Sequence, residues 1–235
     1  MGLITNNTNQ GGATFLSVRI STDAKGRKNA VLAKRCDEGT PGARQIFKAD
    51  GSPALTKEGQ TCWRLEYDAI EGFITRLEKH EAEWGNYLHI HIKDGADKFV
   101  LSLDRGDRYW SDFLLRLPLL TPQTLTKFQP YSIADEDGKK TNQGISMRQF
   151  GKKVERRWSK EAGYEGGPPQ ATFDEDEQEW KWGKRNKWME ENILDPIAQE
   201  YEGAHPLEGQ PMPDQPEPGD GPPPHSEDDE DGLPF

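Results

Sequence analysis

The sequence predicts a mainly β fold, a small antiparallel β-barrel with one short helix, followed by a disordered acidic C-terminal tail. Three observations favour this fold. Short stretches that alternate apolar and polar residues, as strands do, recur between residues 13 and 150. Glycine, proline and aspartate clusters of the kind that form turns separate these stretches. One stretch near residue 110 has a helical period instead.

The first predicted strands follow a flexible N-terminus of residues 1–11. They have the sequences ATFLSVRIS (13–21), NAVLAKRC (29–36) and TCWRLEY (61–67), and the turn signals GTPG and DGSP precede the third. Gly72 stands in the middle of the next predicted strand (69–81), where a bulge or a sharp bend is the usual reason.

Two more strands, 86–94 and 98–104, are joined by KDGADK, whose Gly-Ala pair predicts a hairpin. The strand NYLHIHIKD places Tyr87, His89 and His91 on one face and its aliphatic residues on the other. The two histidines could chelate a metal, but no further Cys or carboxylate pattern supplies the remaining ligands. We therefore expect a polar sheet face there.

A short helix is predicted after this meander, since DRYWSDFLLRLPLL has apolar residues at helical spacing and Pro118 ends the pattern. A final hairpin is predicted from KFQPYSIA (127–134) and QGISMRQF (143–150). A five-stranded OB-type barrel, with its helix between the third and fourth strands and additions at the N-terminus, accommodates this order. A two-sheet sandwich accommodates it nearly as well.

The chain is expected to divide at about residue 165. Residues 12–165 form the predicted barrel, an OB-type nucleic-acid-binding domain. Residues 166–202 are an acidic segment that contains tryptophans, either a helix that docks on the barrel or a linear interaction motif or subunit contact. Residues 203–235 contain nine prolines, five glycines, nine acids and no Lys or Arg. Such a composition cannot bury enough apolar surface to offset the entropy of ordering, so a disordered tail is expected.

Charge is distributed unevenly along the chain. The net charge is −11, but residues 1–165 carry 26 Lys and Arg against 22 Asp and Glu, a charge of +4, whereas residues 166–235 carry 4 against 19. A basic body with an acidic tail indicates interaction with nucleic acid or a membrane. No apolar run is long enough to span a membrane, and the first residues do not form a signal peptide, so a cytoplasmic protein is expected.

Catalytic motifs are sparse. The sequence contains no Gly-rich phosphate loop in a strand-to-helix context and no Gly-x-Ser-x-Gly elbow, and its two cysteines are not in metal-type spacing. We therefore expect a protein that is not an enzyme and uses no cofactor or metal.

Bases interleaved with aromatic residues are the feature of the body that points to a ligand. A single nucleic-acid strand needs cations along its phosphates and flat rings on which its bases stack. The run Met147–Trp158 (MRQFGKKVERRW) carries five basic residues and is the strongest local candidate. The predicted DNA-binding residues are Lys34, Arg35, Tyr87, Arg105, Arg108, Tyr109, Trp110, Lys139, Lys140, Arg148, Phe150, Lys152, Lys153, Arg156 and Arg157.

The C-terminal sequence DDEDGLPF combines clustered acids with an apolar hook, which is typical of a peptide that binds a basic-rimmed apolar pocket. It resembles the acidic tip of bacterial single-stranded DNA-binding proteins, in which aspartates precede Ile-Pro-Phe, although Gly232 is an extra residue here. More broadly, the chain is similar to phage replication proteins with a divergent OB domain and an acidic tail. The matching positions are Asp228, Asp229, Glu230, Asp231, Leu233, Pro234 and Phe235.

This resemblance implies a protein that sequesters single-stranded DNA in replication, recombination or repair and recruits partner proteins through its tip. It also implies a location in the cytoplasm of a bacterial host cell if the protein is phage-encoded, and a possible homo-oligomer. The tail, with its nine acids and no base, is expected to compete with DNA for the basic body. Three other functions stay open: a recombination mediator or annealing protein, a DNA-mimic inhibitor, and a nuclease.

Overall fold

The computed structural model describes residues 12–22, 28–48, 51–83, 85–134, 141–159, 164–174 and 177–202. Within these stretches the protein is mainly β, as the sequence predicts. The strands are β1 (Thr14–Thr22), β2 (Lys28–Cys36), β3 (Arg44–Gln45), β4 (Trp63–Tyr67), β5 (Ile70–Ala82), β6 (Gly85–Asp94), β7 (Asp97–Asp104), β8 (Thr126–Ala134), β9 (Thr141–Gln149), β10 (Lys152–Lys153), β11 (Thr172–Asp174) and β12 (Glu179–Lys181). The helical elements are α1 (Arg108–Arg116), the 3-10 turn η1 (Leu117–Leu119), α2 (Gly183–Met189), the π-helical turn η2 (Glu190–Leu194) and α3 (Asp195–Tyr201).

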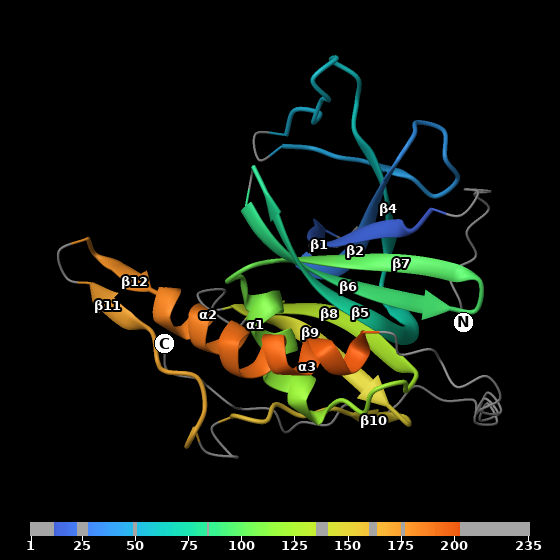
Figure 1. The fold of residues 1–235 in the computed structure, drawn as a ribbon. Helices are drawn as coiled ribbons and strands as arrows, with labels where there is room; N and C mark the ends of the chain where they lie inside the picture. Colours follow the sequence, from blue (N-terminus) through green and yellow to red (C-terminus); the bar gives the residue numbers. More distant parts are fainter. Residues whose placement is uncertain are drawn as a thin grey trace.

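Among the described residues, ten strands form one sheet in the order β10-β9-β8-β5-β6-β7-β1-β2-β4-β3 (Figure 1). The antiparallel meander β5–β6–β7 lies at its centre, and the Gly95–Ala96 turn between β6 and β7 confirms the hairpin predicted there. The hairpin β1–β2 extends the meander because β1 pairs with β7 in parallel. This parallel pairing differs from the antiparallel sheet that the sequence pattern predicts.

The sheet is not closed into a barrel in the part of the chain that the structure describes, because its end strands β10 and β3 do not pair. The predicted closed barrel is therefore not observed. The sheet does fold over, since Cα atoms of β2 and β8 approach within 8 Å. A bend in β5 allows this: Ile70–Gly72 pair with β8, and the residues from Phe73 onward pair with β6. A Cβ on Gly72 would lie 2.8 Å from the carbonyl oxygen of Lys93, so this crossing requires glycine.

Helix α1 closes one side of the core. Asp107 caps its first turn by accepting a hydrogen bond from the Trp110 amide at 2.6 Å. Trp110, Phe113 and Leu114 are fully buried in the core. Pro118 lies in the 3-10 turn η1 directly after the helix, as the sequence predicts.

The C-terminal helical segment, residues 183–201, packs on the same core. Met189, Ile193 and Tyr201 are buried in it, and Lys79 of β5 forms an ion pair with Asp195 at 2.7 Å. Figure 1 shows this segment lying along the body, with the small β11–β12 hairpin projecting beyond its start. No helix among the described residues is long and apolar enough to span a membrane.

Candidate nucleic-acid interface

The turn between β9 and β10 presents an aromatic ring to solvent. Phe150 has a φ of 53° and its residue is 73% exposed. The left-handed backbone conformation costs roughly 1–2 kcal/mol for a residue other than glycine. Because the exposed ring does not repay this cost by packing in the core, its position suggests a contact with a ligand.

Exposed basic side chains lie beside this ring on three neighbouring strands. Arg148 of β9 stands directly opposite Lys127 of β8 on one side and Lys153 of β10 on the other. All three side chains are exposed. Like charges in direct cross-strand register destabilise a sheet, so this arrangement favours a bound anion that neutralises them. We call Lys127, Arg148, Lys152 and Lys153 the basic strip.

Acidic residues offset the strip only in part. Glu155 lies 3.7 Å from Lys153 and is itself exposed, so solvent screens this pair strongly. Glu71 of β5 is the register partner of Lys127. The strip therefore keeps a net positive charge along β9 and β10.

An open hollow of about 490 Å³ adjoins the strip. Its apolar floor includes Leu119, which is exposed, and Val154. The residues that line it are Leu119, Thr121, Gln149, Phe150, Lys152, Lys153, Val154 and Glu155. Gln149 holds the wall in place because its amide donates to the Thr121 carbonyl at 3.0 Å and accepts from the Thr121 amide at 2.9 Å. The flat ring of a ligand can therefore lie against the apolar residues of this hollow, next to the lysines that also line it.

Arg156 belongs to the interior rather than to this surface. Its Nε donates to Asp112 Oδ1 at 2.5 Å and its terminal nitrogen donates to the Tyr131 hydroxyl at 3.1 Å. Asp112 also accepts from Arg116 and from the Ile145 amide. Burial lowers the pKa of Arg156, but its interactions with Asp112 and Tyr131 together outweigh burial and raise the pKa above the ordinary value. Arg156 is half-buried and committed to these partners, and its predicted contact with DNA stays a prediction.

Gly144 is required by this buried network. A Cβ at that position would lie 2.2 Å from Asp112 Oδ2 and 2.5 Å from the Tyr131 hydroxyl. The network therefore fixes α1 to β9 and keeps the strands of the basic strip in place.

Two other predicted arginines have intramolecular partners. Arg105 makes a bidentate contact with Glu190, with its terminal nitrogen 2.7 Å from Oε2. Arg108 donates to the carbonyl oxygen of Thr141. Arg157 is exposed, with its guanidinium 5.2 Å from the ring centroid of Trp158. Arg105 and Arg108 are exposed, but these contacts make them less available to a phosphate than the basic strip.

Two predicted stacking rings lie in the core. Trp110 is 1% exposed and Tyr109 is also buried. Neither ring has a free face for a base, which corrects the prediction for both residues. Their helical spacing is the signal of a buried helix face. Lys34 and Arg35 lie on β2, in the half of the sheet order that is remote from β10.

Tyr87 lies on a separate surface, the outer face of β5, β6 and β1. There the rings of His80 and His89 stack at 4.5 Å, and Phe15 meets His89 edge-on at 5.9 Å. His91 Nε2 lies 3.0 Å from a Glu78 carboxylate oxygen. Burial lowers the pKa of His89, and the neighbouring His80 lowers it further. Within the described residues, no group of three or more His, Cys, Asp or Glu side chains could hold a metal ion.

Lys139 and Lys140 lie outside the described residues, as does the predicted partner-binding tip. The tip comprises Asp228, Asp229, Glu230, Asp231, Leu233, Pro234 and Phe235.

Four predicted residues, Arg148, Phe150, Lys152 and Lys153, are thus brought together, and the sequence prediction missed Lys127. Alternation along β8 was the available signal, because Lys127 precedes the buried Phe128 on the opposite face. Its register with Arg148 could not be read without the strand pairing.

Comparisons with models of protein families, with curated proteins and with solved structures each found no match. The functional argument therefore depends on the geometry of these side chains.

Proposed function

We propose that this protein binds single-stranded DNA through the basic strip and Phe150. The observation that carries the proposal is the direct register of Lys127, Arg148 and Lys153 across three strands, with an exposed ring at the adjoining turn. The cations follow successive phosphates, and the ring stacks on a base.

The exposed ring favours a single strand over a duplex. Bases in a duplex are stacked on one another, whereas those of a single strand have free faces. Phe150 lines the hollow together with Lys152 and Lys153 of the strip and with the apolar residues Leu119 and Val154. This combination supports a role in sequestering exposed single strands during replication or recombination.

The proposed fold is an OB-type domain with an added N-terminal hairpin. Its support is the chain order of meander β5–β6–β7, helix α1 and hairpin β8–β9, with β5 pairing to both β6 and β8. This order matches the OB arrangement, and many OB domains bind oligonucleotides.

We further propose that the acidic tip recruits replication or recombination proteins and that the protein acts in the cytoplasm of a bacterial host cell.

The test is fluorescence anisotropy with labelled oligo(dT) at several salt concentrations between about 50 and 200 mM. The wild-type chain is compared with the double variant Arg148→Ala/Lys153→Ala. Each lost phosphate contact removes about 0.7 from the slope of log affinity against log salt. The double variant should therefore bind more weakly at low salt, with a slope shallower by about 1.4.

The matched control is Lys28→Ala/Lys98→Ala, which removes two exposed bases outside the strip. It changes the net charge equally and is expected to retain most of the affinity. If the two double variants lose affinity and slope equally, the strip is not the site. If the wild-type chain binds no single-stranded, duplex or RNA probe, the proposed function is wrong.

A further inference from the structure

The β11–β12 hairpin carries a second group of exposed rings. Phe173 and Trp180 are direct cross-strand partners, and their ring centroids are 5.4 Å apart. Trp182 lies directly after β12, two residues beyond Trp180, and is the N-cap residue of helix α2. These three rings and that of Tyr164 belong to residues that are between 44% and 48% exposed. Three large aromatic residues with free area on one small hairpin and directly after it indicate a binding surface.

Arg185 lies beside these rings with its charge uncompensated. Its guanidinium is 6.0 Å from the ring centroid of Trp182, and its one direct hydrogen bond goes to the Pro169 carbonyl at 3.5 Å. Its Nε is buried without a partner, and no carboxylate among the described residues forms an ion pair with it. Burial lowers the pKa of Arg185, Tyr164 opposes this shift in part, and Arg156 adds to it. A half-buried cation without a counterion favours an anionic ligand.

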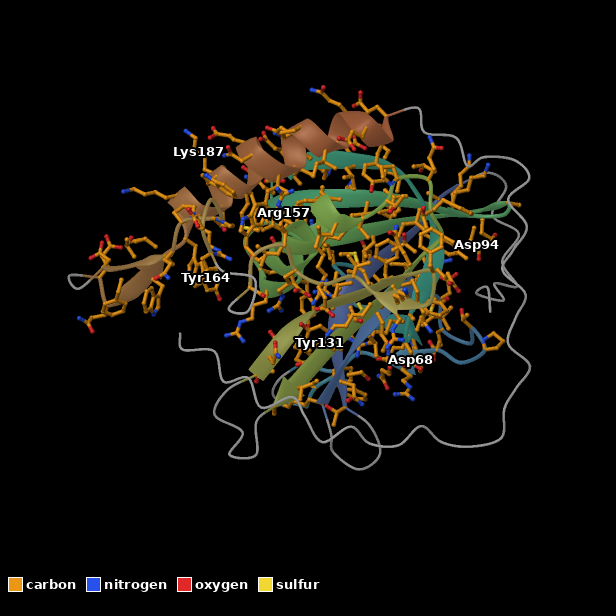
Figure 2. The ribbon with its side chains drawn as sticks, turned by 90° about the horizontal axis from the view of Figure 1, so that it is seen from below. Asp68, Asp94, Tyr131, Arg157, Tyr164 and Lys187 are labelled. Atoms are coloured by element: carbon orange, nitrogen blue, oxygen red, sulfur yellow. The ribbon has the colours of Figure 1, made fainter. Side chains whose placement is uncertain are left out.

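Charge around the root of the hairpin has the sign that a phosphate requires. Lys184 is exposed, and Figure 2 shows Lys187 and Tyr164 toward the end of the molecule from which the hairpin projects. Asp174 and Glu179, the next register pair after Phe173 and Trp180, carry acids on the hairpin itself, and Glu177 pairs with Lys181. The sequence WKWGKRNKW (180–188) interleaves lysine and arginine residues with tryptophans.

The two tryptophans can each offer part of a ring face to a nucleobase, because both residues are exposed. The guanidinium of Arg185 lies 6.0 Å from the ring centroid of Trp182. A phosphate bound at Arg185 would therefore lie next to a nucleobase stacked on that ring.

We propose that the root of the β11–β12 hairpin is a second contact for single-stranded nucleic acid, where bases stack on Trp180 and Trp182 and a phosphate binds Arg185. This inference rests on the proposed function, because it extends the path of the strand beyond the basic strip. In Figure 1 the hairpin and β10 lie at different ends of the molecule. A long strand can reach both contacts, whereas a short one occupies a single contact.

The experiment uses the full chain and two oligo(dT) probes, of about 10 and about 40 nucleotides. The wild-type chain should bind the long probe more tightly by more than the added number of sites explains. Trp180→Ala/Trp182→Ala should bind the long probe about tenfold more weakly while binding to the short probe changes much less. Phe47→Ala, an exposed ring on the separate loop between β3 and β4, is the matched control.

A second variant separates stacking from a general loss of fold. Trp180→Phe/Trp182→Phe keeps both rings, so it should bind the long probe nearly as the wild type does while losing much of the tryptophan quenching on binding. Unchanged long-probe affinity in the alanine variant would overturn the inference. So would a change in sedimentation without a change in DNA affinity, because the rings would then bind protein. Failure of the wild-type chain to bind either probe would instead refute the proposed function.

Discussion

Two groups of bases from one run of sequence have opposite environments. In MRQFGKKVERRW, Arg156 turns inward to Asp112, whereas Arg148, Lys152 and Lys153 face solvent. The inward group holds α1 against β9 through a buried carboxylate, and the outward group lacks such a partner. Composition therefore does not reveal which bases can bind a phosphate, because burial and the nearest carboxylate decide it.

The energetic roles of the two groups differ for the same reason. A buried guanidinium requires its partner, since an unpaired buried charge is strongly destabilising. The Arg116 and Asp112 side chains are 4% and 2% exposed. Exposed bases in mutual register contribute little to stability or reduce it. Variants of the two groups should separate stability from binding.

The largest expected effect comes from removing the shared carboxylate. Asp112→Ala leaves Arg116 and Arg156 without their anion and the Ile145 amide without its acceptor. The free energy of unfolding should fall by about 3–5 kcal/mol, measured by urea denaturation followed by circular dichroism. Any folded protein should keep the salt slope of DNA binding.

Arg148→Ala should weaken DNA binding without destabilising the fold, if the exposed basic residues differ from the buried Asp112 network in this way. Its free energy of unfolding should stay within about 0.5 kcal/mol of wild type, while its affinity for oligo(dT) falls. If Asp112→Ala does not fold, Arg156→Ala tests the same network, because Arg116 still pairs with Asp112 and the loss should be smaller. Equal stability losses in Arg148→Ala and Arg156→Ala would show that the two groups do not differ.

The turn residue Phe150 should give opposite changes in stability and binding. Phe150→Gly removes the penalty of a φ of 53°, so the free energy of unfolding should rise by up to about 1 kcal/mol. Loss of a stacked base should weaken binding by about 1–3 kcal/mol. Thermal denaturation and anisotropy measure the two quantities.

Gln123→Gly is the matched control, because Gln123 also has a positive φ, of 56°, and lies outside the basic strip. It should gain similar stability and keep the affinity. If Phe150→Gly binds as tightly as Gln123→Gly, the ring does not contact DNA.

Sequence patterns predicted the local elements well and the assembly of the sheet poorly. Alternation and turns predicted the β6–β7 hairpin, and the helical period with Pro118 predicted α1. The parallel pairing of β1 with β7 joins strands far apart in sequence, and no local pattern encodes such a contact. The strip was predicted in part because its bases are sequence neighbours, whereas Lys127 joins them only through the register of β8.

The same comparison can be made for acids, with Asp107 as the counterpart of Asp112. Asp107 caps α1 by accepting from the Trp110 amide, but no base among the described residues forms an ion pair with it. Burial, helped by the nearby Asp104, raises the pKa of Asp107 from 3.8 to about 6. The ionised form is therefore disfavoured in the folded state. The matched control for a variant at this position is Asp68→Asn, which replaces an exposed aspartate on another part of the surface (Figure 2).

The smallest expected effect follows from the sign of this shift. Because the folded pKa lies above the unfolded value, the folded chain binds more protons between about pH 4 and pH 7, so this group adds stability as the pH falls through that range. From about pH 7 to about pH 5.5 the gain is about 0.8 kcal/mol. Asp107→Asn keeps a capping oxygen and removes the titration. The unfolding free energy of the wild type should therefore rise by that amount relative to Asp107→Asn as the pH falls. A difference between the two proteins that does not change with pH would place the raised pKa elsewhere.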